Sequence, residues 1–94
     1  MITKYTEYCL LCGKPKEDIH HLVFGNGFRR LADRWSIYIP VCRNCHEAIH
    51  KDIAAQKLSK ICGQLLFEKE AILRGESEDD AREHFREIFG RSYL

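Results

Sequence analysis

Two short stretches rich in apolar residues in the first half of the chain predict strands. Residues 18–24, with the sequence Asp-Ile-His-His-Leu-Val-Phe, predict a short strand. Residues 35–41 are aromatic and β-branched with a proline near their end, and they predict a second, edge-like strand. Between them, the Gly-Asn-Gly of residues 25–27 indicates a turn, and residues 28–34 fit either a helical turn or an ordered loop.

From Arg43 onward the spacing changes to a period near 3.6, which is typical of helices. The first positions that follow this period are Cys45, His46, Ala48, Ile49, His50 and Ile53. A helix through residues 51–74 continues the pattern. Gly63 inside it costs about 1 kcal/mol relative to alanine and is a candidate break. The predicted apolar faces of this helix consist of Leu58, Ile61, Cys62, Leu65, Leu66, Ile72 and Leu73.

A last helix is predicted to begin at Ser77, where the Ser-Glu-Asp-Asp sequence is a capping signature, and to end before Gly90. Its predicted buried stripe consists of Ala81, Phe85, Ile88 and Phe89. These elements make a single small α+β domain over residues 1–94. Its strand–loop–strand–helix core covers about residues 5–51, and a helical extension covers about residues 52–94. A chain this short often needs a metal or disulfide to be stable.

A formal net charge of +1 excludes a strongly basic nucleic-acid coat. The basic residues near the histidines either form a local patch that contacts DNA or are ordinary solvated charges. The candidates are Arg29, Arg30, Arg34, Arg43 and Lys51. The N-terminus lacks the apolar core of a signal peptide, and no later run is long enough to cross a membrane. We therefore expect a cytoplasmic protein whose thiols stay reduced.

Two Cys-x-x-Cys pairs, Cys9 with Cys12 and Cys42 with Cys45, predict a closed metal site. Each pair supplies two sulfurs from one tight turn, and four thiolates suit a structural zinc ion. The 29 residues between the pairs exceed the spacing of a common zinc ribbon and leave room for a functional insertion. Redox dithiols and an iron–sulfur cluster are the alternatives. The fifth cysteine, Cys62, is predicted to be an inert, buried core residue.

Four of the five histidines lie near these cysteines in the sequence. Neighbouring strand residues point to opposite faces, so His20 and His21 cannot both bind one ion in ideal geometry. Four residues apart on a helix, His46 and His50 share one face and suit metal binding. The alternative is that all four are structural or surface histidines, but their clustering favours an open, functional metal site. We assign no role to His84.

These residues resemble the core of the HNH endonucleases. The resemblance covers residues 9–50 and rests on three segments: Cys-Leu-Leu-Cys at 9–12, His-His-Leu-Val at 20–23, and Cys-Arg-Asn-Cys-His-Glu-Ala-Ile-His at 42–50. It implies a ββα-metal (His-Me finger) fold, in which a hairpin is followed by a helix with a metal ion between them. Residues 85–94 are also similar, less specifically, to the ends of small HNH proteins encoded by phages and prophages.

The resemblance implies that His21 is the general base. It implies that His20 and His46 are catalytic metal ligands and that His50 is a third. The chain departs from the family pattern at two positions: many members have Asp where this chain has His20, and the Asn of the signature falls at Ile37. Ligation by imidazole alone favours Zn²⁺ or Ni²⁺ over Mg²⁺, whereas Mg²⁺ or Mn²⁺ becomes more favourable if water or substrate completes the shell.

The leading hypothesis is a metal-dependent endonuclease that nicks or cuts double-stranded DNA, with a structural zinc and a second divalent ion at the active site. Arg29, Arg30 and Arg43 would hold the DNA backbone without reading its sequence. The main alternative is a non-catalytic zinc module that binds DNA or a phage or packaging protein, which the missing Asn favours. An accessory nuclease beside a packaging motor or recombination system and, more weakly, a redox dithiol protein are further alternatives. Two metal ions per chain would favour the enzyme, and one zinc the module.

Overall fold

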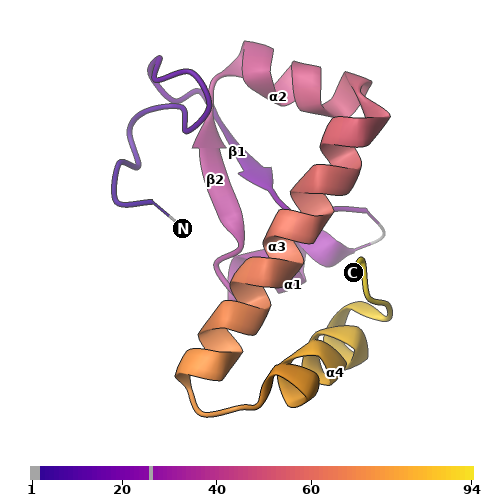
Figure 1. The fold of residues 1–94 in the computed structure, drawn as a ribbon. Helices are drawn as coiled ribbons and strands as arrows, with labels where there is room; N and C mark the ends of the chain where they lie inside the picture. The colour runs from indigo at the N-terminus through magenta and orange to yellow at the C-terminus, as the bar shows by residue number, and fades with distance from the viewer. Residues whose placement is uncertain (1–2, 26) are drawn as a thin grey trace.

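The computed structural model describes residues 3–25 and 27–94 (Figure 1), so the predicted turn at residues 25–27 lies partly outside the described residues, at Asn26. The elements in chain order are β1 (Asp18–His21), α1 (Phe28–Arg34), β2 (Tyr38–Val41), α2 (Arg43–Lys51), α3 (Ile53–Leu73) and α4 (Glu78–Phe89). The two strands pair antiparallel, and the long α3 runs past them towards α4 (Figure 1). This arrangement confirms the small α+β class. Within the described ranges, no helix combines the length and the apolar character needed to span a bilayer.

Both strands are shorter than the sequence predicts. They pair over four residues each, with His20 opposite Ile39. The residues just before β2 do not extend it, because Trp35 ends α1 and Ser36 takes a left-handed backbone with φ of 58°. The segment between the strands forms a true helix, α1, which decides between the helical turn and the ordered loop.

The helical region after β2 breaks at Asp52 and not at Gly63. Asp52 has an extended backbone, and its carboxylate accepts hydrogen bonds from the amides of Ala54 (2.9 Å) and Ala55 (3.2 Å). It therefore caps the start of α3 and separates this helix from α2. Gly63 lies inside an uninterrupted α3, where an added Cβ would be 2.7 Å from Val23 Cγ2. The glycine thus permits the close approach of α3 to the segment that follows β1.

The last helix is confirmed at both ends. The Ser77 hydroxyl accepts a hydrogen bond from the Asp80 amide at 3.1 Å, and Gly90 ends α4 with a positive φ of 82°. Ile88 is half-buried, and the fully buried members of the predicted stripe are Ala81, Phe85 and Phe89. Short-range capping chemistry is therefore enough to set the limits of this helix.

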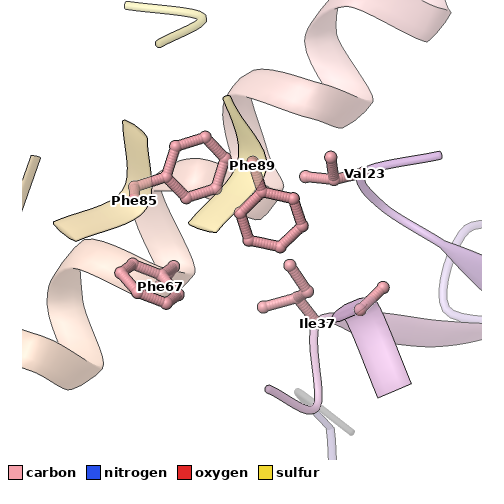
Figure 2. Packing of buried hydrophobic residues seen from close by; sticks show 6 residues of the cluster. Val23, Ile37, Phe67, Phe85 and Phe89 are labelled. Carbon is pink, nitrogen blue, oxygen red and sulfur yellow. The ribbon is translucent and has the colours of Figure 1, made fainter. Parts of the chain in front are cut away.

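Two apolar clusters hold the elements together. The larger one joins α3 and α4 to α1 and the segments flanking the sheet, and it contains Val23, Ala32, Ile37, Phe67, Phe85 and Phe89 (Figure 2). The rings of Phe85 and Phe89 stack with centroids 4.5 Å apart. The smaller cluster contains Cys9, Leu22, Ile39, Val41 and Cys42. Because it includes one cysteine of each pair, it ties the sheet directly to the cysteines.

The exposed face of α3 differs from the prediction. Several side chains of the predicted apolar faces are exposed, namely Leu58, Leu65, Ile72 and Leu73. Cys62 is also exposed, so the prediction of a buried core cysteine is wrong: α3 buries the face that carries Gly63 instead.

The buried face of α3 also carries polar side chains, which have hydrogen-bond partners. Gln64 donates to Glu68 Oε2 at 2.8 Å and accepts from the Tyr93 amide at 2.6 Å.

Candidate metal centres

The four cysteines of the two pairs converge, as predicted, and their sulfur atoms all lie within 4.8 Å of one another. Cys9 and Cys12 lie on a turn in which the Gly13 amide donates to the Cys9 carbonyl at 2.9 Å. Gly13 has a φ of 78°, which few other residues adopt without strain. Cys42 caps the start of α2, and its sulfur accepts from the Cys45 amide at 3.5 Å. The helix therefore begins inside the cysteine cluster.

The spacing and the charge of this cluster suit zinc. Cys12 Sγ and Cys42 Sγ lie 3.6 Å apart. A tetrahedron with Zn–S bonds of ~2.3 Å has an edge of ~3.8 Å. Burial raises the pKa of Cys9, but hydrogen bonds from neighbouring backbone amides outweigh it and lower the pKa to about 6. The Cys42 side chain raises the pKa of Cys45 to about 12. The Cys9 thiolate therefore forms readily, whereas the Cys45 thiol needs a nearby cation to lose its proton. The four cysteines could thus hold a zinc ion.

A second cluster consists of His20, His46 and His50, whose ligand atoms lie within 4.8 Å of one another. β1 contributes His20, and α2 contributes the other two from adjacent turns. The His20 side chain is almost completely buried. Burial and, to a smaller extent, the neighbouring imidazoles lower its pKa to about 4. His20 is therefore neutral near pH 7, which is the state in which an imidazole binds a metal ion.

A hydroxyl from α3 determines which nitrogen of His20 carries the proton. The Ser59 hydroxyl donates its one proton to the Leu22 carbonyl at 2.8 Å. The same oxygen lies 2.8 Å from His20 Nε2, so this nitrogen must be protonated and must donate. The lone pair of the neutral ring is therefore on Nδ1, which is left for a metal ion.

Asp18 determines the proton position of His46 in the same way. His46 Nδ1 lies 3.3 Å from Asp18 Oδ2. A carboxylate only accepts hydrogen bonds, so Nδ1 carries a proton, and in the neutral ring Nε2 holds the lone pair. Metal-binding histidines commonly have such a partner on the far nitrogen, because it orients the ring and raises its basicity. Two of the three clustered imidazoles thus have the proton arrangement that metal binding requires.

His21 lies beside the three-histidine cluster without belonging to it, as strand alternation predicts. Its Nε2 lies 2.6 Å from Asp33 Oδ1 in α1. All four histidines nevertheless line one open hollow of about 640 Å³. His21 therefore lines the same hollow as the three candidate metal ligands but is not one of them.

The predicted basic residues do not form one patch around these histidines. Arg29 lines the histidine hollow. Arg34 lines a separate hollow between the α1–β2 connection and α3. Arg43 is exposed and forms an ion pair with Glu17 at 3.9 Å. The remaining two candidates, Arg30 and Lys51, are exposed. Among the described residues, Arg29 is thus the best placed of the five to contact a ligand in the histidine hollow.

Three side chains that orient the histidines were not predicted from the sequence. Asp18 carried a signal, because it lies two residues before His20 in a strand and shares its face. Ser59 and Asp33 come from helices far from their histidine partners along the chain. No local pattern connects such residues, so only the tertiary structure identifies them.

The fold and its first cluster define a small α+β protein with four cysteines suited to a zinc ion. The family model that matches the chain is described as a protein of unknown function (DUF968), and it covers residues 3–74. The chain therefore belongs to this family. The match includes both cysteine pairs and the histidines of β1 and α2. No curated protein and no solved structure matches the chain.

Proposed function

We propose that the protein is an HNH-type, metal-dependent endonuclease that hydrolyses phosphodiester bonds in double-stranded DNA. The observation that carries the proposal is that three neighbouring imidazoles each have one ring nitrogen engaged by a polar partner from elsewhere in the fold. In its neutral form, each ring then keeps a lone pair on its other nitrogen: His20 and His46 belong to the three-histidine cluster, and His21 lies beside it. The succession β1, β2 and α2 around these histidines also agrees with the hairpin and helix of a ββα-metal core.

In the proposed reaction, His21 is the general base. Its Nε2 proton is engaged by Asp33, so Nδ1 takes a proton from a water molecule. As this proton leaves, the water oxygen bonds to phosphorus and the bond from phosphorus to the 3′ oxygen breaks. The leaving oxygen takes a proton from solvent, which gives a 5′-phosphate and a 3′-hydroxyl.

The residues proposed to hold a divalent ion are His20, His46 and His50. When bound, such an ion supplies charge neutralisation at the phosphate and at the leaving oxygen. Three protein ligands leave a coordination position for substrate, which distinguishes catalytic zinc sites from closed structural ones. Arg29, exposed at the same hollow, is proposed to contact the DNA backbone.

A non-catalytic zinc module that binds DNA or a phage or packaging protein is the second candidate. Ile37 favours it, because this residue stands where the HNH signature has Asn and is buried in the larger core. An apolar side chain cannot make the hydrogen bonds of an amide. Under this alternative the protein would bind one zinc per chain, whereas the enzyme requires two ions. Elemental analysis of the purified protein separates these outcomes.

The test of the proposed activity is nicking of supercoiled plasmid DNA in the presence of Mn²⁺, Mg²⁺, Ni²⁺ or Zn²⁺. We expect His21→Ala to lower the rate by roughly 10²- to 10⁴-fold, the usual contribution of a general base. The matched control is His84→Ala, which removes an imidazole that packs against Trp35 at the separate hollow. Unchanged cleavage by His21→Ala would remove the base assignment. No cleavage with any of the four metals, together with one zinc per chain, would favour the module.

A further inference from the structure

His21 and Asp33 form a short hydrogen bond between β1 and α1. The Nε2 to Oδ1 distance is 2.6 Å, below the usual 2.9 Å or so of N–H···O bonds, as is common when the acceptor is ionised. Because the carboxylate can only accept, Nε2 carries the proton, and a neutral ring keeps its lone pair on Nδ1. The His21 side chain is 13% exposed and that of Asp33 is 57% exposed. The carboxylate therefore lies at the protein surface, whereas the imidazole ring is largely enclosed.

The backbone that carries Asp33 is held in place by the larger core. The Asp33 carbonyl accepts from the Ser36 amide at 3.2 Å. The carbonyl of the preceding residue, the buried Ala32, accepts from the Ile37 amide at 3.0 Å. Since the side chains of Ala32 and Ile37 both belong to the larger core, α1 cannot shift without disturbing that core. The Asp33 backbone therefore has a fixed position, from which the carboxylate reaches the imidazole.

We propose that Asp33 is a positioning residue that keeps His21 protonated on Nε2 and holds its Nδ1 free towards the substrate. The inference rests on the proposed function, in which Nδ1 takes the proton from water. Without the carboxylate, the ring can rotate about its side-chain bonds and can exchange its proton between the two nitrogens. A ring protonated on Nδ1 cannot accept a proton there, so the fraction of competent molecules falls. Asp33 thus supplies, from α1, an orienting hydrogen bond that Ile37 cannot make.

Two variants and a matched control test this role in the plasmid assay. We expect Asp33→Ala to lower kcat by roughly 10- to 100-fold with KM unchanged, the range typical of groups that orient a functional imidazole. Asp33→Asn keeps the shape of the side chain, but its amide can present an N–H donor that favours the Nδ1–H tautomer, so this variant should not recover the loss. Glu87→Ala removes one negative charge from an exposed position of α4 and should leave the rate unchanged.

A second measurement reports the tautomer of His21 without any cleavage. Long-range ¹H–¹⁵N NMR spectra distinguish a proton on Nε2 from one on Nδ1. They are recorded on the zinc-loaded full chain at about pH 8, above the ordinary histidine pKa of about 6.5. We expect the Nε2–H form in the wild type and a mixture of both forms in Asp33→Ala. If the protein cuts no DNA but shows this change, the orienting contact stands and the proposed function falls. Wild-type His21 protonated on Nδ1, or undiminished kcat in Asp33→Ala, would overturn the positioning role.

Discussion

The cysteine and histidine clusters share α2 but are enclosed to different degrees. The cysteine cluster offers four sulfurs from two tight turns, and two of them, on Cys9 and Cys42, belong to buried residues. The histidine cluster offers three ligands and opens onto a hollow of about 640 Å³. Four protein ligands complete a tetrahedral ion, whereas three leave a position for a reactant. Turn geometry builds each cysteine pair and the smaller core brings the two pairs together, whereas the open cluster also depends on side chains such as Ser59 that orient its imidazoles from other elements.

The largest expected effect concerns the closed cluster. Cys42→Ser should abolish the folded state, because structural zinc contributes ~10–16 kcal/mol in small zinc peptides at neutral pH. This zinc contribution is as large as the whole free energy of unfolding of an ordinary domain, which is ~5–15 kcal/mol. The measurement is thermal unfolding followed by circular dichroism. Cys62→Ser, at an exposed cysteine, is the control and should change the free energy of unfolding by no more than ~0.5 kcal/mol. A cooperative transition retained in Cys42→Ser would show that the cysteine cluster does not hold the fold.

Removal of one ligand from the open cluster should have a more local effect. We expect His46→Ala to lower the zinc content from two ions per chain to one while the far-ultraviolet circular dichroism is preserved, because His46 is only half-buried. Metal content is measured by elemental analysis after equilibration with limiting zinc. His84→Ala provides the control, since it deletes an imidazole outside the cluster. A wild-type protein that carries a single ion would contradict the second site directly.

The smallest predicted effect is that of removing Ser59, the hydrogen-bond partner of the candidate ligand His20. Ser59→Ala leaves the buried Nε2–H of His20 without its acceptor, so metal affinity at the histidine cluster should fall roughly 10- to 100-fold, or about 1.4–2.7 kcal/mol. Competition titration with a coloured chelator measures this affinity. Ser77→Ala is the control, because it removes a helix cap worth ~1 kcal/mol of stability and should leave the affinity unchanged. Equal affinities in wild type and Ser59→Ala would show that Ser59 does not orient His20.

Features of the fold that depend on short stretches of sequence could be predicted. The limits of α4 follow from a capping serine at one end and a glycine at the other, and the cysteine pairs follow from their spacing. The break at Asp52 was missed, because an aspartate inside a periodic apolar pattern can also be a surface residue. The exposure of Leu58 and Cys62 was missed for a related reason. Periodicity identifies apolar faces, but not which one the rest of the chain covers.

The candidate site divides in the same way. The histidines were predicted from their proximity to the cysteines and from the helical spacing of His46 and His50, and the structure brings these two together with His20. The groups that fix their protons could not be predicted, since Ser59 lies 39 residues from its partner along the chain. The residues that could bind an ion are therefore apparent in the sequence, whereas those that orient them appear only in the folded chain.

Because Cys42 caps the start of α2, one helix connects the two clusters. The imidazoles of His46 and His50 reach His20 only when this helix is in place, and its first turn belongs to the cysteines. In a chain that takes up both ions, loading would follow a hierarchy in which sulfur captures the first ion and so prepares the nitrogen trio for the second. A chelator strong enough to strip the sulfurs would empty both, and a titration of the apo protein would trace two linked steps.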